Sequence, residues 1–139
     1  DFIKAKEYYA LAMRGSAELS GAVYYNDQPP EMLYYQALAA DALGKTKQSR
    51  GMFNKLISYG LEHMEDNAEA DYFAVSLPDF LVFEPDLNRK NRVTCSYLAA
   101  LGYYGIGDKE KAQELTDKGL SENISHQGLL ELKKQLKGN

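Results

Sequence analysis

One helical pattern recurs three times along this chain, and it restricts the possible folds more than any other feature. In each copy, positions spaced by four and then three residues carry a small, a larger and a small or apolar side chain. The copies are Ala5, Tyr9 and Ala12, then Ser49, Phe53 and Leu56, and last Ala112, Thr116 and Gly119. This spacing keeps the three positions on one helical face, which can pack against a neighbouring helix. The recurrence predicts a stack of repeated helical units.

The two later copies each follow a glycine turn and an earlier helical segment. Gly44 and Gly107 occupy the turns. The earlier segments carry Leu33, Ala37 and Ala40 in one case, and Ser96, Ala100 and Tyr103 in the other. Helix, glycine turn and helix form the unit that stacks into solenoids. We therefore expect an all-α fold built from antiparallel helical hairpins.

The segment from Ser96 to Ser121 resembles a repeat of the tetratricopeptide-repeat (TPR) family. The matching positions, which hold that family's small, aromatic and turn residues, are Ala100, Tyr103, Gly107, Asp108, Ala112 and Gly119. The copy from Leu33 to Leu56 is degenerate, because Ala40 stands in place of an aromatic residue and Ser49 in place of the usual alanine. The resemblance implies a short TPR-like right-handed α-solenoid that serves as a scaffold and catalyses no reaction.

The spacing between the copies indicates insertions. Ser49 follows Ala5 by 44 residues and Ala112 follows Ser49 by 63, against about 34 in a regular repeat. We expect one domain made of a half repeat and loop (1–30), a degenerate repeat (31–65), an irregular helical insertion (66–91), a repeat (92–122) and a capping helix (123–139). Two prolines break the insertion, which is expected to hold a short extra helix or a degenerate helical pair.

Periodicity and capping residues predict the individual helices. The expected ranges are 2–13, 31–43, 46–64, 67–76, 87–104 and 109–120, followed by a last helix that ends at Lys137. Asp86 and Ser125 are the expected caps of the fifth and last helices. Leu129, Leu132 and Leu136 share one face of the last helix, as in the terminal cap of a solenoid.

Two segments are similar to the C-terminal helical part of large bacterial proteins that join a β-rich, sugar-enzyme-like module to TPR units. They are Tyr72 to Phe83 and Asn123 to Gly128. This resemblance implies an alternative function, that of a helical accessory domain in a carbohydrate-active or carbohydrate-binding protein. The chain starts with Asp1 and an unpaired half hairpin, so we expect a fragment of a longer protein whose upstream part could carry a signal.

Charge and hydropathy exclude some partners. The net charge is −4, from 16 Lys and Arg against 20 Asp and Glu, whereas nucleic-acid binding depends on clustered cations. No apolar run approaches the roughly 18 residues of a membrane span. No basic segment precedes an apolar stretch as in a signal peptide. We expect no nucleic acid and no membrane partner, and a cytoplasmic location.

Residues with catalytic or metal-binding chemistry are few. His63 and His126 are the only histidines and share no ligand motif. Cys95 is expected to be a small buried apolar residue. Asp79 and Glu84 lie near prolines, where turn residues are common. We therefore expect no enzymatic activity, no metal and no cofactor.

Tyrosine is the unusual component, because eight of the 11 occur as adjacent pairs. Neighbouring helical positions point about 100° apart, so one ring of a pair can enter the core while the other lies at a groove or an edge. In the TPR register the positions on the concave side are Tyr34, Leu38, Asp41, Tyr97, Leu101 and Tyr104. Phe80 and Phe83 are further candidate contacts in the insertion.

These residues give two interpretations. In the first, the chain is a non-catalytic interaction scaffold whose tyrosine-lined concave face holds a peptide, another domain of the parent chain or a second copy. In the second, the rings simply cover an aromatic core and its rim. The sequence leaves the partner and the oligomeric state open.

Overall fold

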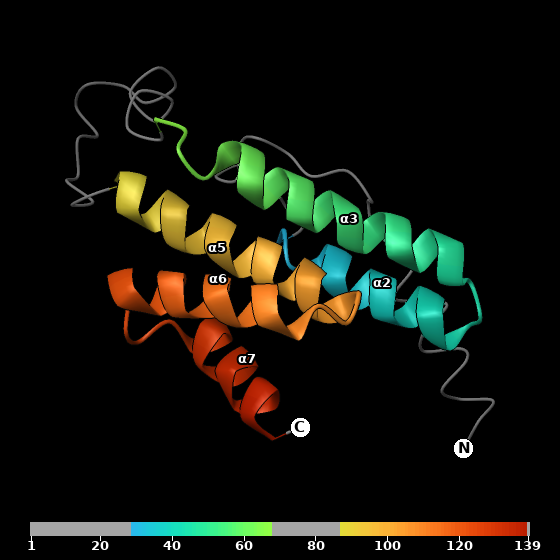
Figure 1. Cartoon of the computed structure of the whole chain (residues 1–139). Helices are drawn as coiled ribbons and strands as arrows, with labels where there is room; N and C mark the ends of the chain where they lie inside the picture. Colours follow the sequence, from blue (N-terminus) through green and yellow to red (C-terminus); the bar gives the residue numbers. More distant parts are fainter. Residues whose placement is uncertain (1–28, 68–86, 139) are drawn as a thin grey trace.

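The computed structural model describes residues 29–67 and 87–138 (Figure 1). Five helices make up most of this part: α2 (Met32–Ala42), α3 (Thr46–His63), α5 (Leu87–Gly105), α6 (Lys109–Glu122) and α7 (Gln127–Lys137). No strand occurs in these two ranges. The expected all-α fold is thus confirmed for the described residues.

The helix boundaries predicted from sequence hold closely. For the four helices expected at 31–43, 46–64, 87–104 and 109–120, the observed ends lie within two residues of the prediction. The helices expected at 2–13 and 67–76, the Asp86 cap and the repeat copy that begins at Asp1 lie outside the described residues.

The turn between α2 and α3 follows a specific hydrogen-bonding pattern. Gly44 has a φ of 81°, a left-handed conformation that glycine adopts without steric cost. Its N–H donates to the carbonyl of Asp41 at 3.0 Å, and the N–H of Lys45 donates to the carbonyl of Ala40 at 2.8 Å. These two bonds form a Schellman motif, which satisfies the last carbonyls of α2 and ends the helix.

The turn between α5 and α6 repeats this pattern 63 residues later. Gly107 has a φ of 88°. Its N–H donates to the carbonyl of Tyr104 at 3.1 Å, and the N–H of Asp108 donates to that of Tyr103 at 2.9 Å. The Asp108 side chain also accepts a bond from the N–H of Lys111 and so caps α6. The two hairpins therefore share their closing geometry, as the repeat pattern predicted.

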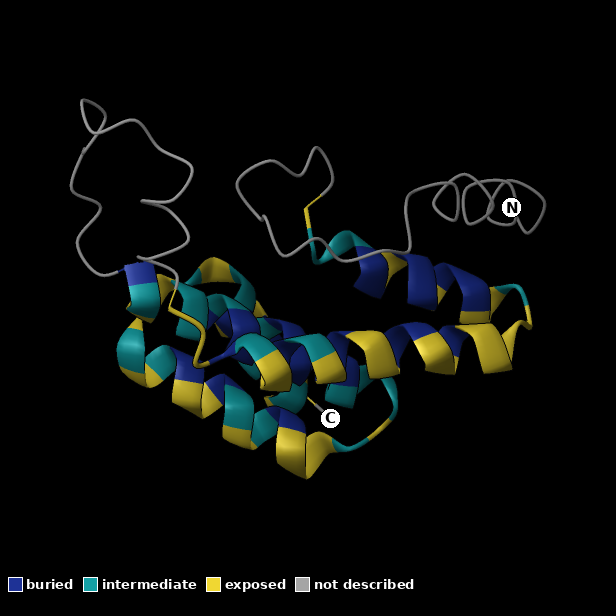
Figure 2. Cartoon of the chain, turned by 90° about the horizontal axis from the view of Figure 1, so that it is seen from above, coloured by how far each residue is buried: buried dark blue, intermediate teal, exposed yellow. Residues whose placement is uncertain are grey.

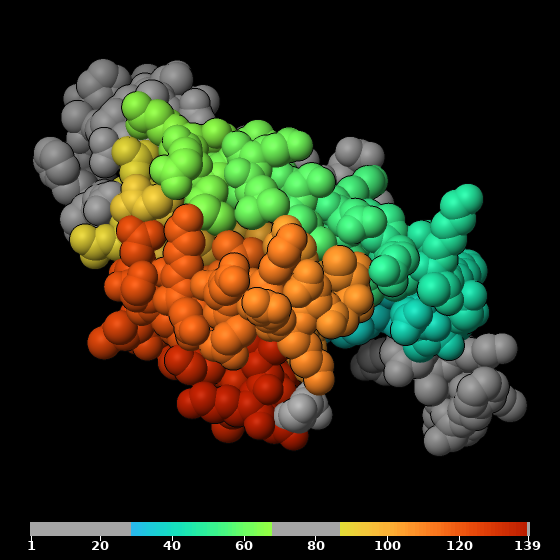
Figure 3. Space-filling view, in the orientation of Figure 1, coloured from blue at the N-terminus to red at the C-terminus, as the bar shows by residue number. Residues whose placement is uncertain are grey.

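Consecutive helices pack against one another along the chain. α2 contacts α3, α3 contacts α5, α5 contacts α6 and α6 contacts α7, while α5 also touches α2 and α7. α3 and α6 lie side by side on one face of the molecule (Figure 3). α5 is thus the central helix, with every other described helix in contact with it.

Two glycines allow α3 and α5 to approach closely. A Cβ on Gly60 of α3 would lie 2.5 Å from the carbonyl oxygen of Cys95. A Cβ on Gly102 of α5 would lie 2.6 Å from the carbonyl oxygen of Phe53. Backbone therefore meets backbone at two levels of this helix pair, and no larger residue fits at either level without displacing a helix.

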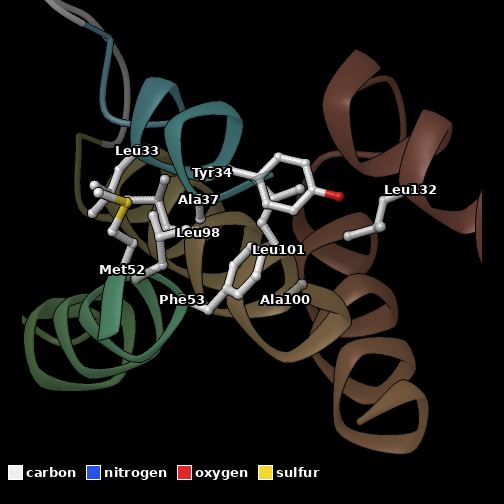
Figure 4. Packing of buried hydrophobic residues seen from close by; sticks show 10 residues of the cluster. Leu33, Tyr34, Ala37, Met52, Phe53, Leu98, Ala100, Leu101 and Leu132 are labelled. Carbon is white, nitrogen blue, oxygen red and sulfur yellow. The ribbon is translucent and has the colours of Figure 1, made fainter. Parts of the chain in front are cut away.

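The core lies where α2, α3, α5 and α7 meet. Its cluster of buried residues comprises Leu33, Tyr34, Ala37, Met52, Phe53, Leu56, Leu98, Ala100, Leu101 and Leu132 (Figure 4). Exposed residues collect on the outward sides of the helices and buried ones on the inward sides (Figure 2). Burial of these apolar side chains is the main stabilising term of such a small fold.

The last helix differs from its prediction at the cap. His126, rather than Ser125, caps α7, because its Nδ1 accepts the N–H of Leu129 at 3.1 Å. The Ser125 hydroxyl and N–H instead donate to Oδ1 of Asn123, both at 3.1 Å. The expected apolar face is present. Leu129 and Leu132 are buried, and Leu136 is partly buried and packs against the core.

Candidate functional site: the tyrosine face

The adjacent tyrosines of α2 divide between the core and the surface. Tyr34 is 8% exposed, and its ring centroid lies 5.9 Å from that of Phe53. Its hydroxyl points away from Phe53, toward the side on which Leu132 lies (Figure 4). Tyr35 is 50% exposed and meets the Tyr34 ring edge-on at 5.4 Å. The one-in, one-out arrangement expected for adjacent tyrosines is confirmed for this pair.

The tyrosines of α5 lie half-buried beside those of α2. Tyr97 and Tyr104 both pack against the core cluster, and Leu101 between them is buried within it. Spacings of four and three place the three side chains on one face of α5. The aromatic groups that reach the surface here are the exposed ring of Tyr35 in α2 and the half-buried rings of Tyr97 and Tyr104 in α5.

The N-terminal end of α7 covers one side of Tyr97. The ring centroids of Tyr97 and His126 lie 5.1 Å apart. A Cβ on Gly128 would lie 2.6 Å from the Tyr97 ring. The absence of a side chain at position 128 therefore makes room for the aromatic ring.

The phenol groups influence one another electrostatically across the two helices. Burial raises the pKa of Tyr34 to about 12, and Tyr104 and Tyr35 add to the shift. Burial also raises the pKa of Tyr97 to about 12, with further contributions from Tyr35, Glu31 and Tyr34. The Glu31 carboxylate thus contributes to the same electrostatic environment as the hydroxyls. At neutral pH the phenols stay protonated and can both donate and accept hydrogen bonds.

His126 joins this group through the contact of its ring with Tyr97. Because Nδ1 accepts the Leu129 N–H, the neutral ring carries its proton on Nε2. Burial lowers the pKa of His126, while Glu31 opposes the shift. We name this group the tyrosine face: Glu31, Tyr34, Tyr35, Tyr97, Tyr104 and His126.

The structure distributes the predicted concave residues among three environments. Tyr34 and Leu101 are buried in the core and offer a partner little surface. Tyr97 and Tyr104 are half-buried in the tyrosine face. The remaining two predicted residues, Leu38 and Asp41, are exposed on α2, and the exposed fraction of Leu38 is 40%. Phe80 and Phe83, the candidate contacts of the insertion, lie outside the described residues.

Sequence reasoning missed three members of the face. Tyr35 could have been predicted, because when one tyrosine of an adjacent pair occupies the core, as Tyr34 does, the other is expected at the surface. Glu31 and His126 carried no comparable signal, because their proximity depends on how α7 packs against α5.

Groups with possible chemistry elsewhere are separate from the tyrosine face. Cys95 is 1% exposed, as expected for a small apolar residue, and burial raises the pKa of its thiol to about 11. His63, the last residue of α3, and Asp66 form a pair in which Nδ1 and Oδ2 are 2.6 Å apart. No three His, Cys, Asp or Glu residues within 29–67 and 87–138 come together as a metal site.

Comparison with known proteins assigns no family. No family model matches the chain, and no solved structure matches it. The TPR resemblance therefore stays a prediction. In the part of the chain that the structure describes, no helix has both the length and the apolar character needed to cross a membrane.

Proposed function

We propose that this chain is a non-catalytic interaction module that holds a protein segment on its tyrosine face. The observation that carries the proposal is a surface of aromatic and apolar groups. Tyr35 and Leu38 are among the few large apolar side chains that are well exposed in residues 29–67 and 87–138, and the half-buried rings of Tyr97 and Tyr104 belong to the same face. Tyrosine is enriched at protein interfaces because it combines an apolar ring with a polar end.

The state of the polar groups supports binding rather than catalysis. The raised pKa values of Tyr34 and Tyr97 keep these phenols neutral. The Nδ1 of His126 is occupied by its helix cap. Such groups can donate hydrogen bonds to a partner, but they supply neither an activated nucleophile nor a strong general base.

The proposal includes a TPR-like right-handed solenoid in which the two hairpins are successive units. Its support is the identical hydrogen bonding of the turns at Gly44 and Gly107 and the order in which the helices pack. In such a stack α2, α5 and α7 are the first helices of successive units and line the concave side. The tyrosine face comes from these helices and from the cap of α7.

Comparative affinity capture tests the proposal. We would use the chain, a Tyr35→Ser/Leu38→Ser variant and a Leu61→Ser/Ile124→Ser control on the lysate of the source organism. The control positions are also exposed, at 49% and 81%, but lie outside the tyrosine face. A protein retained by the chain and the control, but lost with the face variant, is the expected result. Equal capture by all three would overturn the proposal.

Location of the contact provides the second readout. With the captured partner, NMR signals of Tyr97 and Tyr104 should shift, while those of Tyr103, whose ring lies under Lys111 and outside the tyrosine face, should not. Binding of an oligosaccharide at the same tyrosines, without capture of a protein, would favour the carbohydrate-accessory alternative instead.

A further inference from the structure

The charges around the tyrosine face have one sign. Between residues 29 and 42, the only charged side chains are Glu31 and Asp41. From Val93 to Gly107, α5 and its following turn carry no charge. The surface that these segments build is therefore acidic, although the chain contains 16 lysines and arginines.

The nearest charged residue of α7 to the tyrosine face is a carboxylate, with exposed Lys134 one turn further along the helix. Gly128 faces Tyr97, and Glu131 follows one turn later on the same helical side. The lysine of α7 that forms a described ion pair lies elsewhere: Lys133 bonds to Asp117 of α6 at 3.2 Å. Lys111, the cation that stacks on a ring, lies over Tyr103 and not over the tyrosine face.

The acidic groups are open to a partner. Asp41 and Glu131 are exposed. The Glu31 side chain makes no capping bond to α2, although this residue occupies the cap position. Within the described residues, the ion pairs involve other carboxylates, those of Asp66, Glu122 and Asp117.

We propose that the segment held by the tyrosine face is basic, and that its lysine or arginine side chains lie over the exposed Tyr35 ring, between Glu31 and Asp41. This inference rests on the proposed function and specifies the partner's chemistry. A cation over an aromatic ring is attracted by the negative face of the ring, and an arginine can stack there as well. Flanking carboxylates then provide complementary charge, which favours the correct register and rejects acidic segments.

The helix also sets the spacing of the cations. Glu31 and Asp41 are ten residues apart on α2, which corresponds to about 15 Å along the axis. The exposed Tyr35 and Leu38 lie between them at spacings that keep all four side chains on one arc of the helix. An extended segment advances about 3.3 Å per residue. Two basic residues roughly four or five positions apart would therefore match the two carboxylates.

Selection from a display library of random 12-residue peptides tests this inference. The library is first depleted on the Tyr35→Ser/Leu38→Ser variant and then selected on the unaltered chain. We expect peptides with two Lys or Arg about four or five positions apart. Their affinity, measured by fluorescence anisotropy, should fall about tenfold in Glu31→Gln/Asp41→Asn and should decrease with added salt.

A charge-matched control separates the local effect from net charge. The Glu62→Gln/Glu114→Gln variant removes two exposed carboxylates from the outer surfaces of α3 and α6 and should bind the peptides as the unaltered chain does. Selected peptides without basic residues, unaffected by Glu31→Gln/Asp41→Asn, would overturn the inference and leave the proposed function standing. No enrichment over the depleted background would count against both.

Discussion

The ring of Tyr97 in α5 lies against the ring of His126, with their centroids 5.1 Å apart. The same histidine caps α7 through Nδ1. One side chain therefore both begins the last helix and holds it against the central one. The position of α7 beside the tyrosine face depends on this pair and on the lack of a side chain at Gly128, where the Tyr97 ring lies.

The protonation state of His126 should affect stability. Its pKa is lowered in the folded chain, mainly by burial, so the folded state binds this proton less readily than the unfolded state. The contribution of neutral His126 to the free energy of unfolding is fully present above about pH 6.5, the ordinary pKa of histidine. This contribution is lost as the pH falls through the folded-state pKa. Protonation of Nδ1 also removes the cap bond, which is worth about 1 kcal/mol in typical helices.

Urea unfolding at pH 7.5 and 5.5 measures this effect. We expect the unaltered chain to lose more stability over this interval than His126→Asn, which keeps a capping side chain that does not titrate. An identical loss in both proteins would assign the pH dependence to other groups.

The adjacent tyrosines of α2 should differ sharply in their effect on stability. Tyr34→Ala removes a ring from the core and should cost about 3 kcal/mol, as for other large-to-small core changes. Tyr35→Ala removes a half-exposed ring and should change stability by about 0.5 kcal/mol or less. Thermal unfolding followed by circular dichroism measures both. Similar losses would contradict the one-in, one-out arrangement.

Two glycines within α3 provide an internal comparison. Gly60→Ala would place a Cβ against the backbone of α5 and should cost roughly 1–3 kcal/mol. Gly51→Ala meets nothing within 4 Å and should stabilise the helix by about 0.5–1 kcal/mol. Opposite shifts in unfolding midpoint are the expected result. Equal shifts would mean that α3 and α5 are further apart than described.

Cys95 should be unreactive in the folded chain. It is nearly inaccessible, and its raised pKa leaves little thiolate at pH 8. We expect its reaction with a thiol reagent to be at least about a hundredfold slower than in urea-unfolded protein. Rapid modification without denaturant would show that the interior around α5 opens readily.

Gln36 is a buried amide whose two polar atoms find no hydrogen-bond partner among residues 29–67 and 87–138. Its side chain is 1% exposed, and an unpaired buried amide costs free energy. Gln36→Met keeps the volume and removes the polar atoms, so it should raise the free energy of unfolding by about 1–2 kcal/mol. A loss of stability would indicate that the amide has a partner outside residues 29–67 and 87–138.

Local sequence signals predicted the helices well because each boundary has a local cause. Gly44 and Gly107 end their helices through a conformation that glycine adopts easily. Small residues such as Ala37 and Ala112 marked the packed faces, and both are fully buried. These effects depend on neighbours within one or two helical turns, which the sequence displays directly.

The candidate site was only partly predictable because its environment is set by distant segments. Leu38 and Leu101 occupy equivalent positions 63 residues apart, yet the first is exposed and the second buried. The difference arises from packing, since α5 is surrounded by other helices. Ser125 had the better intrinsic capping preference, but Asn123 engages its hydroxyl and N–H, and His126 takes the role.

The matching turns at Gly44 and Gly107 have a consequence for how the chain reaches its native state. Each is closed by bonds that span only a few residues, so either hairpin can assemble before the other without a long loop-closure step. Chains dominated by such short-range closure fold quickly. The slower event is then the meeting of α3 with α5, where Gly60 and Gly102 require close backbone contact. Folding rate should accordingly respond more to changes at that junction than to changes in either turn.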